Sequence, residues 1–169
     1  EYYAMGLISQ LLVEGKDSRL YQRMVQQKGF TSNVNGGINY LGNMFNYNGP
    51  MLWMTDLIHD ITIQPHSIIA QLDAAIADIN NDISTATIDL AMVKMRSDLY
   101  DNLGGDYGIG LADMLATLAL FEDNPGRVNE LELAFKQVTP ELVRKTIGTY
   151  LRPENRTILI AQPAKTSTK

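Results

Sequence analysis

The spacing of apolar residues changes its period along this 169-residue chain, and this change limits the folds open to it. Residues 3–12 carry apolar side chains at the three- and four-residue intervals of a helix, whereas residues 30–63 alternate them among Asn and Gly, as two or three strands would. Helical spacing returns over residues 65–151, and residues 157–161 form a short β-branched run. This order predicts an α+β fold, with helices packed on one face of a mainly antiparallel sheet.

Helix boundaries follow from capping residues and helix breakers. Gly15 is expected to end the first helix and Ser18 to cap the second, which ends at Gly29. The clearest helix start is Thr-Pro-Glu at residues 139–141, where a capping hydroxyl precedes a proline and an acid. The Gly-Gly pair at residues 104–105 is expected to break or kink a long helical pattern.

The composition fits a single folded domain. Hydrophobic residues make up 45% of the chain and charged residues 20%, which supplies a core. Residues 1–163 are predicted to form the domain and residues 164–169 a disordered tail. The most apolar stretch, residues 111–121, is too short to span a bilayer, so no membrane segment is expected. The lack of cysteine is compatible with both the cytoplasm and the bacterial periplasm, and the localisation stays open.

Charge is distributed unevenly along the chain. Residues 73–132 hold twelve acids and three bases, whereas residues 133–169 hold two acids and seven bases. This pattern offers no positive stripe for phosphate contacts, so nucleic acid is not expected as a partner. The acidic segment could attract basic peptides or cations, but a solvated helix face is the favoured interpretation, because such runs usually serve solubility.

Few side chains suit catalysis or metal binding. The only histidines, His59 and His66, are too few to supply three convergent zinc ligands. Ser18 and Ser67 fit helix caps better than a catalytic triad, because the chain has no Gly-x-Ser-x-Gly motif. The glycines of residues 104–110 lack the lysine of a phosphate-binding loop. We therefore assign no catalytic residue and no metal ligand, and the substrate-binding residues stay unassigned.

Three motifs follow one another along the chain. They are Gly-Lys-Asp-Ser-Arg-Leu-Tyr at residues 15–21 with Lys-Gly at 28–29, Val-Thr-Pro-Glu-Leu-Val at 138–143, and Tyr-Leu-Arg-Pro-Glu-Asn-Arg-Thr at 150–157. Their order and separation resemble the second half of insulinase-like (pitrilysin and processing-peptidase) zinc metallopeptidases.

This resemblance implies two homologous α+β halves that face one another around a peptide chamber. The catalytic half carries a His-x-x-Glu-His zinc motif on the helix that corresponds to residues 3–13. No histidine lies in those residues, so the chain resembles the non-catalytic half, and zinc is expected only in the catalytic partner half.

The resemblance also sets expectations for contacts and partners. Some relatives place an arginine and a tyrosine of this half near the scissile peptide, but no Lys or Arg lies between Lys28 and Lys94, and Phe30 stands where the tyrosine is usual. The first strands of the family are expected to be missing ahead of Glu1. An open sheet edge would then favour association with another copy of the chain. The expected partners are a homologous catalytic half, on the same polypeptide or a separate subunit, and a peptide substrate.

The leading hypothesis is a non-catalytic domain that encloses and positions peptide substrate while the partner half hydrolyses it, so that this chain alone is inactive. Two alternatives stay open. One is a structural scaffold subunit of a larger assembly, and the other is an adaptor that binds a peptide strand at an exposed sheet edge.

Overall fold

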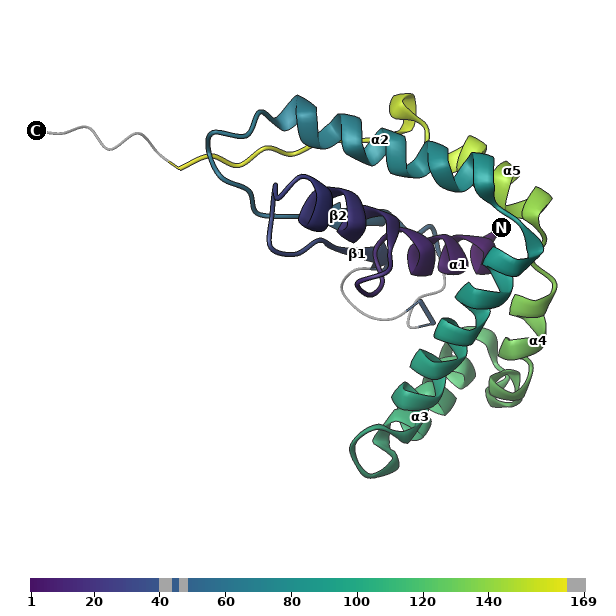
Figure 1. The fold of residues 1–169 in the computed structure, drawn as a ribbon. Helices are drawn as coiled ribbons and strands as arrows, with labels where there is room; N and C mark the ends of the chain where they lie inside the picture. The colour runs from purple at the N-terminus through teal and green to yellow at the C-terminus, as the bar shows by residue number, and fades with distance from the viewer. Residues whose placement is uncertain (40–43, 46–48, 164–169) are drawn as a thin grey trace, which may run out of the picture.

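The computed structural model of the protein describes residues 1–39, 44–45 and 49–163. Its helical elements are α1 (Tyr2–Leu12), the π-helix η1 (Tyr21–Gln27), α2 (Pro65–Asp82), α3 (Thr85–Glu122), the 3-10 helix η2 (Pro125–Asn129), α4 (Leu131–Lys136), α5 (Pro140–Tyr150) and the 3-10 turn η3 (Pro153–Asn155). Strands β1 (Asn35–Ile38) and β2 (Trp53–Asp56) form an antiparallel pair. The predicted α+β class is confirmed, and helices dominate it (Figure 1).

α1 is the central helix of the fold. It packs against β1 and against α2, α3, α4 and α5, and Figure 1 shows it in the middle of the molecule below α2. Ala4, Leu7 and Ile8 have no exposed surface. All residues from 4 to 10 are buried, and seven consecutive residues point in every direction around a helix, so α1 is covered on most sides and forms the middle of the hydrophobic core. No helix in the described part of the chain is both long and apolar enough to cross a membrane.

The small sheet is tied to α1 by a hydrogen bond. Ile38 lies opposite Trp53 in the antiparallel pair, and the indole Nε1 of Trp53 donates to the hydroxyl of Ser9 at 3.0 Å. That hydroxyl donates in turn to the carbonyl oxygen of Met5 at 3.1 Å. Two strands alone are marginally stable in water, so this contact helps to fix the sheet on the helix.

α3 reverses direction along its length. Figure 1 shows its far end turning back, and Leu99 packs in one cluster with Leu118. In a straight helix, which rises 1.5 Å per residue, these two side chains would lie about 28 Å apart. The carbonyl oxygen of Asn102 also comes so close to Gly110 that a Cβ there would overlap it. The reversal agrees with the break or kink predicted at residues 104–105.

The predicted helix boundaries can be compared with the observed ones. The hydroxyl of Thr139 accepts a hydrogen bond from the Leu142 amide at 3.2 Å, which confirms the predicted cap of α5. Gly15 follows the end of α1 with φ +79°, as its expected role requires. The prediction for Ser18 is wrong: the residue is 1% exposed, and its hydroxyl has no hydrogen-bond partner within the described residues. Its side chain is buried in the interior and caps no helix.

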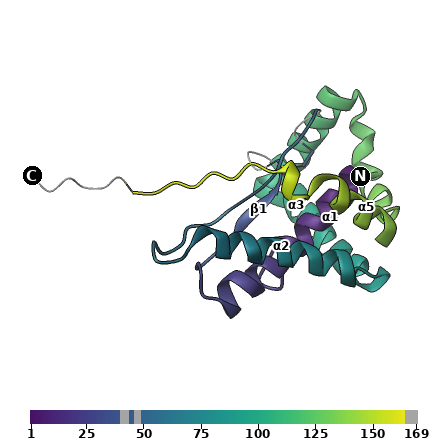
Figure 2. The same cartoon turned by 90° about the horizontal axis from the view of Figure 1, so that it is seen from above.

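The strand predicted at residues 157–161 is not formed. β1 and β2 pair only with each other, so this segment has no ladder partner among the described residues. Figure 2 shows it running away from the helices as extended chain, and Leu159 is 91% exposed. β-branched residues favour a strand only where a neighbouring strand accepts their hydrogen bonds. The start of the segment is held to α2, because Arg156 donates to both carboxylate oxygens of Asp73.

The predicted central strands are shorter than expected. β2 takes up four residues of the apolar run at 51–63, and the rest of that run carries no strand. Tyr40 and Tyr47 of the alternating pattern, and the predicted tail at 164–169, lie outside the described residues.

Candidate functional site

A cavity of about 740 Å³ lies along one face of α1. Its walls come from α1, from residues 33–39, which include β1, and from α3, with Met44 and Phe45 completing the lining. The cavity therefore joins segments that are far apart in the sequence. Because α1 is held on its other sides by the core, its cavity-facing side chains have a fixed position.

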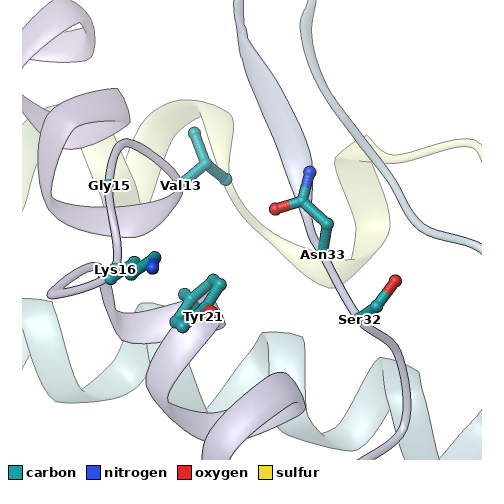
Figure 3. A pocket seen from close by; sticks show the side chains of 6 residues that line it. All are labelled: Val13, Gly15, Lys16, Tyr21, Ser32 and Asn33. Atoms are coloured by element: carbon teal, nitrogen blue, oxygen red, sulfur yellow. The ribbon is translucent and has the colours of Figure 1, made fainter.

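A second cavity of about 330 Å³ adjoins the first at the end of α1. The two share Val13, Gly15 and Asn33. Figure 3 shows Lys16 and Tyr21 on one side of this smaller cavity and Asn33, with its neighbour in sequence, on the other. We call the two cavities together the α1 cleft. The first of the three sequence motifs, residues 15–21, forms part of its border.

Three residues of α1 line the larger cavity with a distinctive spacing. Gly6, Ser9 and Gln10 stand at positions i, i+3 and i+4, which is the spacing of the metal ligands and general base in a His-x-x-Glu-His helix. On α3, Asp98 faces them, and the side-chain Nε2 of Gln10 donates to Asp98 Oδ2 at 2.7 Å. A hydrogen bond therefore joins the two helices here.

These residues do not suit a metal ion. Glycine supplies no ligand atom, and zinc sites in proteins are built from Cys, His and carboxylates. Among the residues that the structure describes, no three His, Asp or Glu side chains gather in a way that could hold a metal. The histidines considered from the sequence lie elsewhere, since neither His59 nor His66 lines the α1 cleft.

The side chain of Gln10 leaves one acceptor without a donor. Gln10 is 5% exposed, and its Oε1 has no hydrogen-bond partner in the described part of the chain. The orientation of the amide follows from its other contact, because the carboxylate of Asp98 accepts from Nε2. A buried acceptor without a donor costs about 1–3 kcal/mol. The oxygen is enclosed by its neighbours and does not open to the α1 cleft.

The α1 cleft also gathers negative charge. Glu14, Asp98 and Asp101 line the larger cavity. Burial raises the pKa of Glu14, and the charge of Asp98 raises that pKa further, while Lys94 acts in the opposite direction. The carboxylate of Asp98 is thus close enough to Glu14 to disfavour the ionisation of Glu14.

The nearby cation, Lys94, is already engaged. Its Nζ donates to the carbonyl oxygens of Glu14 at 2.7 Å and Gln10 at 3.3 Å, and to Asp17 Oδ1 at 2.9 Å. The hydrogen bond from Lys94 lowers the pKa of Asp17. Lys94 thereby caps the C-terminal end of α1, where a positive charge is favoured. Its donors are directed at α1 and at the turn after it. Among the described residues, the α1 cleft itself is lined by three carboxylates, those of Glu14, Asp98 and Asp101, and by one cation, Lys16.

Within the described residues, β1 pairs with a strand on one edge only, and Gly36, Gly37 and Ile38 line the α1 cleft. The Asn39 amide donates to the Leu52 carbonyl oxygen of the neighbouring strand at 3.4 Å. Because bonding alternates along an antiparallel pair, the main-chain groups of Gly36 and Ile38 point away from β2. Gly37 has φ +148°, which side chains rarely adopt, and a Cβ there would lie 3.9 Å from Glu14 Oε1. Gly37 is buried, and Gly36 and Ile38 are half-buried.

Sequence reasoning missed these cleft residues. The acidic segment at 73–132 supplies two of the carboxylates, Asp98 and Asp101, and both are exposed, as the interpretation as a solvated face expects. Gly6, Ser9 and Gln10 gave no signal, because every helix has residues at positions i, i+3 and i+4 and these three are not the residue types of a zinc helix. The pairing of Gln10 with a residue 88 positions later carried no signal in a single sequence.

Comparison with solved structures defines the fold. The inactive peptidase domain of a candidate zinc protease from Bordetella parapertussis superposes with a TM-score of 0.74 at 17% identity, over 98% of this chain and 86% of that one. A protease from Helicobacter pylori matches with a TM-score of 0.72 at 17% identity, over 89% and 35%. A peptidase M16 inactive domain from Pseudomonas fluorescens matches with a TM-score of 0.63 at 15% identity, over 89% and 34%.

The chain thus has the fold of inactive M16 peptidase domains, as the resemblance in its motifs implied. It spans about a third of the length of the Helicobacter pylori and Pseudomonas fluorescens chains. No protein-family model and no curated protein matches the sequence.

Proposed function

We propose that this chain is the non-catalytic half of a zinc metalloendopeptidase, which encloses and positions a peptide substrate while a partner half carries the zinc site. The observation that supports the proposal is the α1 cleft, a polar cavity beside the edge of β1 that pairs with no other strand among the described residues, in a fold shared with inactive peptidase domains. Its α1 has no histidine at the cleft-facing positions. The zinc and the glutamate base would therefore belong to the partner half.

The edge of β1 suggests how a peptide would be held. An extended peptide can add to a free strand edge through main-chain hydrogen bonds, here to the outward groups of Gly36 and Ile38. Such bonds are independent of side-chain identity, so they suit a chamber that accepts varied sequences. Holding the peptide in one orientation would lower the entropic cost of reaching the partner's active site.

Association with another copy of the chain belongs to the same proposal. The extended segment at 157–161 exposes Ile158, Leu159 and Ile160 without a neighbouring strand among the described residues. Unpaired extended segments of this kind are ready to pair with another chain.

The proposal can be tested by cleavage of an unstructured peptide in the presence of zinc. We expect no cleavage by this chain alone, and cleavage when a matching catalytic half is added. A peptide with N-methyl groups on alternate residues, which cannot pair with β1, should be cleaved more slowly by the same mixture. Cleavage by the chain alone would contradict the proposal. Equal cleavage by the catalytic half with and without this chain would instead favour a scaffold role.

A further inference from the structure

We propose that the smaller cavity of the α1 cleft binds the carboxylate at the C-terminal end of a peptide, and that this peptide runs antiparallel to β1. The inference rests on the proposed function, because it gives the direction and the anchored end of the peptide that the same cleft would position. The first of the three sequence motifs contributes to this cavity, since Gly15, Lys16 and Tyr21 line it.

The charge of the smaller cavity differs from that of the larger one. Among the described residues, Lys16 is the only charged side chain that lines the smaller cavity, whereas the carboxylates of the α1 cleft line the larger cavity. The acid next to it in sequence, Asp17, is paired with the ammonium group of Lys94 at 2.9 Å. The smaller cavity therefore offers a positive charge to a ligand, and a carboxylate is the matching group.

Three side-chain donors border the smaller cavity without an acceptor. In the described part of the chain, no hydrogen bond or ion pair engages the ammonium group of Lys16 or the hydroxyls of Tyr21 and Ser32. Lys16 and Tyr21 lie on one side of the cavity and Ser32 on the other (Figure 3). An ionised carboxylate has two oxygens that accept hydrogen bonds and no donor, so it can accept from both sides at once.

The position of β1 gives the direction of the peptide. β1 begins at Asn35, two residues after Asn33, which both cavities share. A peptide bonded to the outward groups of Gly36 and Ile38 would therefore reach the smaller cavity as it passes the start of β1. An antiparallel peptide has its C-terminal end there. A parallel peptide would instead bring its N-terminal ammonium beside Lys16, where like charges repel.

A carboxylate at the end of the chain suits this position better than an acidic side chain. Ser32 and Asn33 precede β1 in the chain, so the cavity that they line lies beyond the paired residues of the strand. Side chains project to the two faces of a strand, whereas the terminal carboxylate continues along its line. The end of an added peptide would therefore enter the cavity without a change in the direction of its main chain.

The test uses isothermal titration calorimetry with the full chain and one extended peptide sequence in four forms. The forms have both ends blocked, a free C-terminal carboxylate, a free N-terminal ammonium, or both ends blocked with a glutamate near the C-terminus. We expect the free carboxylate to strengthen binding about fivefold over the blocked form, because Lys16 is exposed and solvent screens its charge. The free ammonium and the glutamate should give no such gain. The preference should shrink as salt is raised.

Variants identify the smaller cavity as the source of the preference. Lys16→Gln should remove most of the preference for the free carboxylate, and Tyr21→Phe should reduce it. Lys28→Gln is the matched control, because it removes an exposed lysine that lines neither cavity and should leave the preference unchanged. Circular dichroism checks that each variant is folded.

The outcomes separate this inference from the proposed function. Equal affinity for the free-carboxylate and blocked forms overturns the inference but leaves peptide positioning intact. A preference that survives in full in Lys16→Gln places the carboxylate elsewhere and also overturns it. An equal gain from glutamate overturns the assignment to the chain end, and a gain from the free ammonium overturns the direction. Failure of all four forms to bind overturns both this inference and the positioning role.

Discussion

Glu14 is a single residue whose ionisation works against the folded state. Burial and the charge of Asp98 raise its pKa above the ordinary value. Between the ordinary and the raised pKa the folded protein binds more protons than the unfolded chain, so stability falls as pH rises through this window. We expect Glu14→Gln to raise the Tm at pH 7, and the gain to vanish below the ordinary pKa of glutamate. Thermal unfolding at a series of pH values measures it.

Glu141 provides a control of opposite sign. The pKa of Glu141 is lowered, chiefly by a backbone hydrogen bond at the start of α5 and then by Thr139. The ionised Glu141 carboxylate therefore stabilises the folded state above the ordinary pKa, and this stabilisation is lost as pH falls. Glu141→Gln should lower the Tm at pH 7 or leave it unchanged. A gain in Tm from Glu141→Gln as large as that from Glu14→Gln would refute the explanation based on the α1 cleft.

Thr139 is the residue on which the start of α5 depends. Its hydroxyl accepts from the Leu142 amide, and its replacement by alanine leaves that amide without a side-chain partner. We expect Thr139→Ala to lower the free energy of unfolding by about 1 kcal/mol in urea denaturation. Thr149→Ala, which removes an exposed hydroxyl bonded to the Lys145 carbonyl of the same helix, should change it by less than about 0.5 kcal/mol. Similar losses in the two variants would argue against the cap.

At the scale of elements, the contact between β1 and β2 depends on a glycine. A Cβ on Gly36 would lie 2.6 Å from the main-chain oxygen of Met54, and backbone cannot move aside as a flexible side chain can. We expect Gly36→Ala to lower the free energy of unfolding by about 1–3 kcal/mol. The chain has one tryptophan, Trp53 on β2, so its fluorescence should report the disturbed sheet directly.

Gly148 on α5 is the matched control for this change. Nothing lies within 4 Å of the Cβ that an alanine would add there, and alanine favours a helix by up to about 1 kcal/mol over glycine. Gly148→Ala should therefore raise the stability and leave the Trp53 fluorescence unchanged. A shift of the fluorescence in both variants would show that it does not report the sheet alone.

The elements that sequence reasoning predicted well are those with local causes. The cap at Thr139 and the left-handed Gly15 both depend on neighbouring residues, and both are observed. The strand at 157–161 depends on a partner strand far away in the chain, and none lies beside it among the described residues. The predicted cap at Ser18 was wrong for a similar reason. Packing against distant residues buries its side chain, and the local sequence does not show that packing.

The candidate site was less predictable than the fold. Its components come from α1, from β1 and from α3, and the contact that joins two of them links Gln10 to Asp98. Composition indicated the acidic segment and the motifs indicated the fold, but neither shows which carboxylates share a cavity. Periodicity could place Gly6, Ser9 and Gln10 on one face of a helix. Their residue types do not indicate a site unless the residues on the other side of the α1 cleft are known.

At the scale of the whole molecule, the exposed apolar chain end has a consequence in solution. Leu159 is 91% exposed within the extended segment that follows η3. We expect the chain to associate as its concentration rises, and Leu159→Lys to reduce this association in sedimentation velocity. Leu133→Lys places the same charge at another exposed leucine, 59% exposed on α4, and should have a smaller effect. Equal effects would attribute the association to general hydrophobicity.

The reversal of α3 separates a small second core from the main one. Leu99, Met114, Leu118 and Leu131 form this cluster, and only partly buried side chains such as Tyr3 connect it with the core around α1. So small a cluster supports a local opening that costs less than global unfolding, and native-state hydrogen exchange should show faster exchange beyond Leu99 than in α1. Asp98 stands at the base of this arm. Asp101 and Asn102, further along the arm, also line the α1 cleft, so a local opening of the arm would change the width of the cleft without unfolding the main core.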